Sequence, residues 1–143
     1  SAIRAGASGA KWHNGFLSHA EAVYDFAKPL GPVRMIGHSL GAASAQIAGA
    51  SLGIPVIAFA SPRTKHGARR FPNEGWVLNL NRRDDLVGWL PPGRLGFRHL
   101  GSVYGLRPPG RNPGIDHSMG HYIRLLAHPV AGRRVPRVWP PRI

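Results

Sequence analysis

Residues 37–41 read Gly-His-Ser-Leu-Gly, which places Ser39 in a G-x-S-x-G pattern. Residues 33–36 are largely apolar and have the length of a buried strand, whereas residues 40–52 are alanine-rich with apolar side chains at helical spacing. A strand that turns directly into a helix needs a strained turn at the serine. Glycines flank such a turn because a Cβ there would collide with the neighbouring strand or helix. Since the turn exposes the hydroxyl beside the free N–H groups of the helix, Ser39 is predicted as a nucleophile that attacks a carbonyl group.

A serine nucleophile needs a general base, and the base needs an acid that orients it. In hydrolases with this turn the acid and then the histidine follow the serine. Glu74 precedes a predicted strand, at the wrong end of it, while Asp84 and Asp85 follow that strand; Asp116 opens a predicted helix, where N-capping is its ordinary role. Asp85 is therefore predicted as the acid, and Asp84 as a surface partner of the arginines at 82–83. The acidic residues are Glu21, Asp25, Glu74, Asp84, Asp85 and Asp116.

Four histidines follow Asp85 and could supply the base. His99 lies in a predicted hairpin, and His128 begins the C-terminal tail. His117 lies at a loop-to-helix junction, from which a side chain can reach across the sheet edge, and is predicted as the base. His121 lies one helical turn later and is predicted to pack or hydrogen-bond locally. Because this histidine pair lacks the internal glutamate of zinc hydrolases, no metal site is predicted.

The elements that must position these residues follow from the periodicity of apolar side chains. Ser18 is a predicted N-cap with Glu21 as its capping-box partner, and the last helix has an apolar face that includes Met119 and Tyr122. This order of elements predicts an α/β fold with a mostly parallel sheet flanked by helices, whose ligand edge lies at the carboxyl ends of the strands. The predicted elements are strands 33–36, 54–60 and 76–80, a strand or hairpin at the sheet edge over 96–106, and helices 18–28, 40–52 and 116–127.

Several motifs in order carry a family resemblance: His-x-Gly-Phe at 13–16, Gly-His-Ser-Leu-Gly at 37–41, Phe-Ala-Ser-Pro-Arg at 59–63, Asn81 through Asp-Leu-Val to Leu-Pro-Pro at 90–92, Gly-Phe-Arg-His at 96–99 and Asp-His at 116–117. Over residues 13–126 the chain resembles the class 3 lipase family, which contains the filamentous-fungal triacylglycerol lipases and related phospholipases. The resemblance implies a truncated α/β-hydrolase-like fold, with Ser39 as nucleophile, Asp85 as acid, His117 as base, the backbone N–H of Leu40 as an oxyanion donor, and no cofactor.

The N-terminal region departs from the family pattern. Family members carry a longer N-terminal part, with an Arg-Gly-Thr/Ser-like turn that supplies a second oxyanion donor, and a lid helix. Residues 4–8 read Arg-Ala-Gly-Ala-Ser, which matches that turn poorly and lies too close to His13, so no second donor is assigned. Ala42 stands where the family often has glycine. Without a lid, interfacial activation is not predicted.

The length of 143 residues predicts a single domain over 1–143, with a loosely ordered lead over 1–12 and an irregular tail, rich in proline and arginine, over 129–143. No apolar run approaches the roughly 20 residues of a membrane span, and no secretory signal opens the chain, so we expect a soluble protein. The absence of cysteine excludes disulfides and thiolate metal sites.

Nineteen basic residues against six acidic ones give a formal net charge of +13. Nucleic acid, anionic lipid or plain solubility could each explain this charge, which by itself identifies no function beyond a general affinity for anions. No zinc finger, RNP motif or basic heptad is present, so no specific nucleic-acid partner is predicted, and an anionic lipid surface is kept as one candidate partner. The predicted function is hydrolysis of short- to medium-chain acyl esters or glycerides, because a short lidless domain has little acyl-binding surface. The alternatives are a phospholipase-type acyl hydrolase acting on anionic phospholipids, and a non-catalytic basic module that retains the fold.

Overall fold

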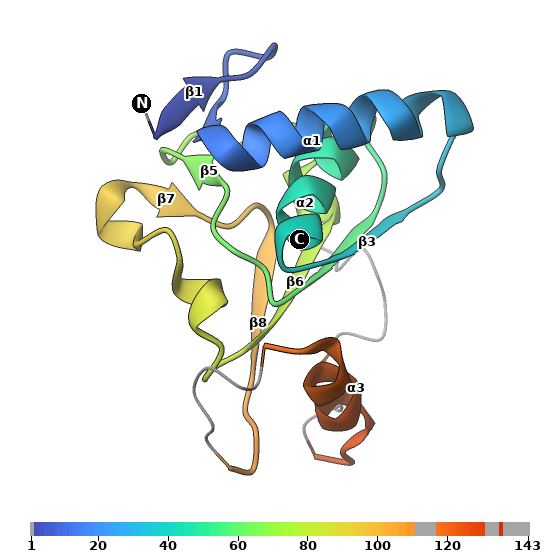
Figure 1. Cartoon of the computed structure of the whole chain (residues 1–143), viewed down its shortest axis with the longest axis vertical. Coiled ribbons are helices and arrows are strands. Elements are labelled where there is room, and N and C mark those ends of the chain that lie inside the picture. The colour runs from blue at the N-terminus through green and yellow to red at the C-terminus, as the bar shows by residue number, and fades with distance from the viewer. Residues whose placement is uncertain (1, 111–116, 131–134, 136–143) are drawn as a thin grey trace.

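In the computed structural model, which describes residues 2–110, 117–130 and 135, the centre is a parallel sheet with strand order β3-β4-β6-β8. Each pairing is parallel and in register, so that the end of β3 lies level with the end of β4. The carboxyl ends of these strands therefore share one edge (Figure 1). The strands are β3 (Met35–His38), β4 (Val56–Phe59), β6 (Val77–Arg82) and β8 (Ser102–Leu106).

Helices cover both faces of this sheet, as predicted, because its strands carry apolar side chains on both sides. Along β4, Val56 and Ala58 pack into the core formed with α1 (Asn14–Ala27) and α2 (Leu40–Leu52). Ile57 and Phe59 face the opposite core, formed with α3 (Met119–Ala127). The mostly parallel α/β architecture predicted from the sequence is thereby confirmed, and the predicted bounds of α2 are correct.

A second, antiparallel sheet of order β1-β2-β5-β7 corrects the prediction of a loosely ordered lead over residues 1–12. Trp12 is buried against Leu17 and contacts Phe71 edge-on, so tertiary burial of one large ring orders a stretch that has no periodicity of its own. The strands are β1 (Ile3–Ala5), β2 (Lys11–His13), β5 (Lys65–His66) and β7 (Phe97–Arg98).

Several predicted bounds differ from the structure. α1 begins at Asn14, because Ser18 and Glu21 accept hydrogen bonds from Arg4 instead of capping a helix at residue 18. β3 lies two residues later than predicted. The predicted hairpin over 96–106 divides between the two sheets as β7 and β8. α3 begins at Met119, and position 116 lies outside the described residues.

Within the described residues, four single-turn 3-10 helices connect the strands and helices, and two of them flank β6: η2 (Glu74–Trp76) precedes it and η3 (Leu86–Trp89) follows it. The others are η1 (Lys28–Leu30) and η4 (Gly93–Leu95). Most of the predicted tail over 129–143 lies outside the described residues, and the single domain over 1–143 stays a prediction. None of the helices described here is long and apolar enough to cross a membrane.

Candidate active site

The turn between β3 and α2 holds Ser39 in a strained conformation, with φ 56° and ψ −120°. Positive φ is uncommon for any residue with a side chain and marks a position that its surroundings force. A Cβ on Gly37 would collide with the backbone of Gly41, as expected, but a Cβ on Gly41 would meet open space. The steric requirement for glycine predicted on both sides therefore holds only before the serine.

The structure brings the three predicted catalytic residues within hydrogen-bonding distance of one another. His117 Nε2 lies 2.8 Å from Ser39 Oγ, and His117 Nδ1 lies 3.1 and 3.0 Å from the two carboxylate oxygens of Asp85. Ser39 comes from the turn before α2, Asp85 from the end of β6 and His117 from the residues just before α3. They share the carboxyl edge of the parallel sheet, which is where ligands bind in such folds.

Asp85 is held from several sides and is almost fully buried. Its carboxylate accepts a hydrogen bond from the Val87 N–H at 3.0 Å and from the Tyr122 hydroxyl at 2.8 Å, in addition to the contact with His117. The Tyr122 oxygen in turn accepts the Arg82 N–H at 3.0 Å. Burial raises the pKa of Tyr122, and the neighbouring Asp85 carboxylate raises it further, so the phenol stays protonated and donates.

This geometry can perform general base chemistry. When Nδ1 of His117 donates its proton to Asp85, Nε2 is the free acceptor, and it faces the hydroxyl of Ser39. The His117 side chain is 31% exposed while that of Asp85 is 1% exposed, so the base is open to a substrate and the acid is shielded. The arrangement therefore combines an accessible proton acceptor with a fixed anion behind it.

Leu40 is the first residue of α2, so its backbone N–H has no acceptor within the helix and lies beside Ser39. The N-terminal turn over 6–8 does not supply a second oxyanion donor here. It lines a cavity together with Ile47 and Ser51 of α2, at least two helical turns from Ser39.

Two residues that complete the site were not assigned a role from the sequence. His38 Nε2 lies 2.7 Å from the carbonyl oxygen of His117, and the two imidazole rings are 4.9 Å apart. His38, the residue before Ser39, therefore links this turn to the backbone of His117. Tyr122 was predicted only as part of the apolar face of the last helix. A buried tyrosine needs a hydrogen-bond partner for its hydroxyl, and this requirement could have indicated a contact with a polar group such as the Asp85 carboxylate.

Asp84, the neighbouring acid, has the predicted partner but not the predicted environment. Two nitrogens of Arg82 lie 3.1 and 3.2 Å from its carboxylate oxygens, and both side chains are buried, at 6% and 4% exposure. The pair is therefore a buried one instead of a surface one. β6 ends at Arg82, two residues before Asp84, so the Arg82–Asp84 pair lies at the carboxyl end of this strand, next to Asp85.

The other residues weighed as site members lie elsewhere. Glu74 lies at the amino end of β6, where it pairs with Arg98. His99 Nε2 donates to the carbonyl oxygen of Ser61, 2.8 Å away, and burial lowers the pKa of His99 to about 4. His121 makes the local contact expected of it, 3.2 Å from Arg124.

No protein-family model matches the chain. Its structure is similar to lipase II from Rhizopus niveus, with 28% identity and a TM-score of 0.53, over 70% of this chain and 45% of that one. It is also similar to the mono- and diacylglycerol lipase from Aspergillus oryzae, with 26% identity and a TM-score of 0.58, over 73% and 45%. A third similar structure is a triacylglycerol lipase whose catalytic centre is described as a serine protease triad, with 25% identity and a TM-score of 0.52, over 73% and 49%.

These similarities establish a lipase-like α/β-hydrolase fold. The chain spans about half the length of the three lipases.

Proposed function

We propose that this protein is a serine carboxylic-ester hydrolase of the class 3 lipase type, with Ser39 as nucleophile, His117 as general base and Asp85 as the acid that orients it. The single observation that carries the proposal is the contact of His117 Nε2 with Ser39 Oγ at 2.8 Å, with Asp85 on the other ring nitrogen. The similarity to fungal lipases supports an ester of a lipid-like acid as the substrate.

The reaction proceeds through an acyl-enzyme. Ser39 Oγ forms a bond to the acyl carbonyl carbon as its proton passes to His117 Nε2, and the oxyanion accepts the Leu40 N–H. Collapse of the intermediate breaks the bond to the leaving alcohol, which takes the proton from His117. Water then gives a proton to His117 and attacks the acyl carbon, and the Ser39 oxygen departs with that proton, releasing the carboxylic acid.

The surface beside the acid favours an acyl chain over a purely polar substrate. Leu86, Trp89 and Leu90 follow Asp85 directly and are 60%, 55% and 52% exposed. They are large apolar side chains at the edge where a bound ester must lie. Short- and medium-chain esters or glycerides are proposed because this surface is small.

The test is turnover of p-nitrophenyl esters of increasing chain length by the wild type and by Ser39→Ala. Loss of the nucleophile is expected to lower kcat roughly 10⁴-fold or more. Ser18→Ala, a serine on the exposed side of α1, is the matched control and should keep full activity. A fluorophosphonate probe should label the wild type at Ser39. Folded protein that is not labelled and does not turn over any ester would favour the non-catalytic basic module.

A second candidate substrate class is anionic phospholipid, which the net charge of +13 and the exposed apolar side chains after Asp85 favour. Attraction between a basic protein and an anionic surface is screened by salt. Hydrolysis of anionic vesicles should then fall steeply between low and high salt, whereas hydrolysis of a soluble neutral ester should not. Equal salt dependence for the two substrates would remove this candidate.

A further inference from the structure

The parallel sheet has an open edge at β3. In the strand order β3-β4-β6-β8, β3 is an outer strand, and β4 is the strand that it pairs with among the described residues. The N–H groups of Met35 and Ser39 point inward and donate to carbonyl oxygens of the β4 segment. Because the backbone groups of successive strand residues alternate in direction, the N–H and C=O groups of Ile36 and His38 point outward, away from β4. These groups form the row of donors and acceptors with which another strand can pair.

A row of apolar side chains crosses the sheet and ends exposed at this edge. On the face that α3 covers, Ile36, Ile57 and Leu78 lie next to one another in register on β3, β4 and β6. Leu78 is 2% exposed, whereas Ile36 is 63% exposed. A strand added beside β3 would place a side chain next to Ile36 on this face, so the row would continue and Ile36 would be buried.

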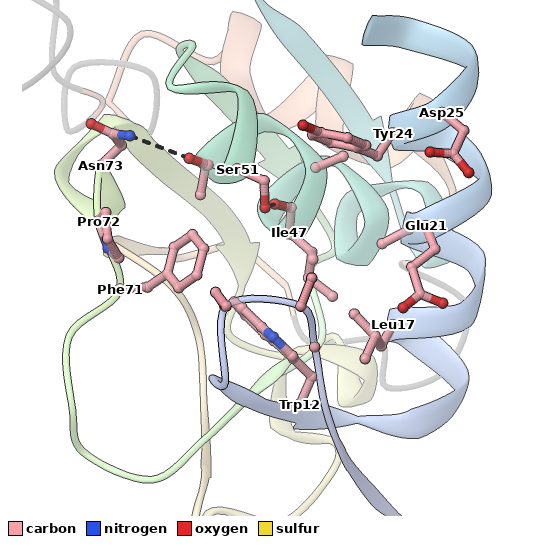
Figure 2. A pocket seen from close by; sticks show the side chains of 16 residues that line it. Trp12, Leu17, Glu21, Tyr24, Asp25, Ile47, Ser51, Phe71, Pro72 and Asn73 are labelled. Atoms are coloured by element: carbon pink, nitrogen blue, oxygen red, sulfur yellow. Dashed lines mark hydrogen bonds between the residues drawn. The ribbon is translucent and has the colours of Figure 1, made fainter.

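The segment that leads into β3 adds further exposed apolar side chains. It runs from the end of α1 along the side of the molecule on which β3 lies (Figure 1), and its Phe26, Leu30 and Val33 are all more exposed than Ile36. Between α1 and α2, by contrast, the apolar core is covered, and Trp12 and Leu17 lie together there and are buried (Figure 2). Proteins normally protect a strand edge with charges, proline or a bulge, so an apolar open edge indicates a binding surface.

The charge near this edge favours an acidic partner. Residues 26–73, which include β3, contain no aspartate or glutamate, and the side chain of Arg34 is exposed two residues before Ile36. A second copy of this chain would bring the same positive charges opposite each other, and an apolar lipid surface offers no hydrogen-bond partners for the outward groups of β3. We infer that β3 binds an extended segment of another protein, in which apolar and acidic residues alternate, and that this segment adds a strand to the sheet.

The probe is a fluorescently labelled, capped peptide of alternating glutamate and valine, Glu-Val-Glu-Val-Glu-Val-Glu, whose binding to the whole chain is measured by fluorescence anisotropy. A matched peptide with lysine in place of every glutamate keeps the valines. The glutamate peptide should bind about tenfold more tightly than the lysine peptide at the same salt concentration, because the exchange turns attraction at Arg34 into repulsion.

Two N-methylated forms of the glutamate peptide test strand addition itself. The valine N–H groups are methylated in one form and the glutamate N–H groups in the other, so each form blocks one side of the extended peptide. Only one side can face β3. One form should therefore lose about tenfold or more in affinity, while the other should bind as the parent peptide does.

Two pairs of variants locate the site. Arg34→Glu should remove the preference for the glutamate peptide, whereas Arg70→Glu, the same change of charge at another exposed arginine, should keep it. Ile36→Ser should weaken the glutamate peptide about threefold or more, because less apolar surface is buried on binding. Leu95→Ser, at a similarly exposed side chain on η4, is the control and should leave binding unchanged.

The inference is overturned if the two N-methylated peptides bind alike, if the glutamate peptide does not bind, or if Arg70→Glu acts as Arg34→Glu does. A dimer of the chain alone in sedimentation velocity, dissociated by the glutamate peptide, would assign the edge to a second copy and overturn it as well. Since the N-methylated pair is measured on the wild type, that comparison decides even where a variant does not fold.

Discussion

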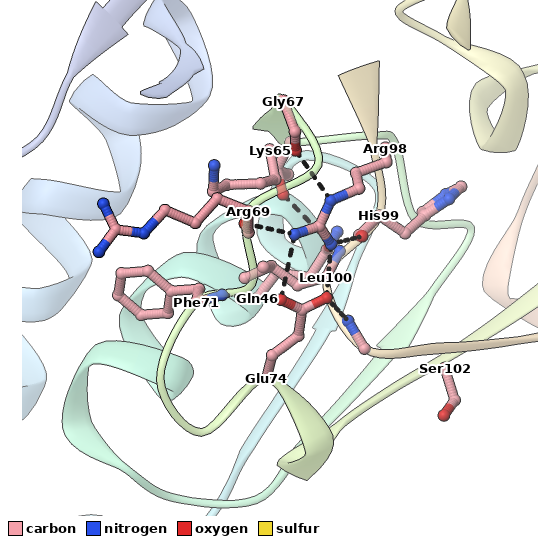
Figure 3. Close-up of polar contacts among 12 residues, drawn as sticks. Gln46, Lys65, Gly67, Arg69, Phe71, Glu74, Arg98, His99, Leu100 and Ser102 are labelled. Atoms are coloured by element: carbon pink, nitrogen blue, oxygen red, sulfur yellow. Dashed lines mark hydrogen bonds and ion pairs between the residues drawn. The ribbon is translucent and has the colours of Figure 1, made fainter. Parts of the chain in front are cut away.

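Two carboxylates at opposite ends of β6, the part-buried Glu74 and the buried Asp85, have similar numbers of hydrogen bonds but partners of different chemistry. Glu74, at the amino end, accepts hydrogen bonds from Arg98, from the Phe71 N–H at 2.9 Å and from the Gly101 N–H at 3.2 Å (Figure 3). Asp85, at the carboxyl end, accepts from His117, from a backbone N–H and from a tyrosine hydroxyl. Each carboxylate accepts hydrogen bonds from side-chain and backbone donors together.

The difference lies in the side chain whose nitrogens contact each carboxylate, Arg98 for Glu74 and His117 for Asp85. Arg98 uses its remaining donors on the carbonyl oxygens of Gly67, Arg69 and His99. The Glu74 centre therefore joins two chain segments, 67–74 and 98–101, and offers no reactive atom. Burial raises the pKa of Glu74, but the hydrogen bonds from Arg98 and the two backbone N–H groups outweigh it and lower the pKa overall. His117, in contrast, keeps one nitrogen for Ser39. The two carboxylates therefore differ in whether the partner side chain has a nitrogen left to contact a possible nucleophile.

Asp85→Asn is the largest expected effect. An amide at this position can fix the wrong tautomer of His117, so that Nε2 no longer accepts the proton of Ser39, and kcat for a p-nitrophenyl ester should fall roughly 10⁴-fold. Circular dichroism should show the wild-type fold. Full activity in Asp85→Asn would remove the contrast between the two carboxylates.

His99, whose carbonyl belongs to the Glu74 centre and whose ring contacts Ser61, should make stability depend on pH. Burial lowers its pKa to about 4 in the folded chain, against about 6.5 when unfolded. Between pH 6.5 and pH 4, His99 binds a proton in the unfolded chain but stays neutral in the folded chain. The free energy of unfolding should therefore fall as the pH drops from 6.5 to 4 and then level off. The loss is at most about 3 kcal/mol.

Urea denaturation at a series of pH values measures this loss. His99→Gln, which can still donate to the Ser61 carbonyl, should remove that part of the pH dependence while the contribution of the acidic residues remains. An identical pH profile in the two proteins would contradict the assignment.

Glu74→Gln should lower the free energy of unfolding by about 2 kcal/mol, because Arg98 keeps its charge and loses its partner in a part-buried position. Activity per folded molecule should be unchanged, the reverse of the result expected for Asp85→Asn. Denaturation in urea and ester kinetics on the same preparation give both values. A fall in kcat as large as the one at Asp85 would show that the two centres are coupled.

His38→Phe should have the smallest effect, about a fivefold loss of kcat with KM unchanged, because one hydrogen bond to the His117 carbonyl is worth about 1 kcal/mol. His38→Gln retains a donor and should recover most of the activity. If both variants are equally impaired, His38 acts through packing and not through this hydrogen bond.

Some features of this protein could be predicted because they depend only on residues that are close together in the sequence. The turn at Ser39, the extent of α2 and the parallel arrangement of β3, β4 and β6 follow from glycine spacing and apolar periodicity, which act within a few residues of each other. The choice of Asp85 and His117 followed from which end of a strand or helix each residue occupies. Their mutual distances are the geometry on which the proposed catalysis rests.

Other features depend on contacts across the chain. The N-terminal residues form β1 and β2 because Trp12 packs against α1 and against Phe71, which lies 59 residues after Trp12 in the sequence. Tyr122 reaches Asp85, and His38 reaches the carbonyl of His117, by the docking of α3 against the sheet. Asp84 and its partner Arg82 are both buried at the end of β6, which neighbouring residues in the sequence do not indicate.

The sequence alone therefore determined the local conformations and the kinds of side chain available at the sheet edge. Only the tertiary structure decided which carboxylate meets a histidine, which meets an arginine and which, Asp25, meets neither among the described residues. The physical reason is that periodicity and turn strain act over one or two helical turns, whereas hydrogen bonds and burial depend on distances in space between residues that may lie anywhere along the chain.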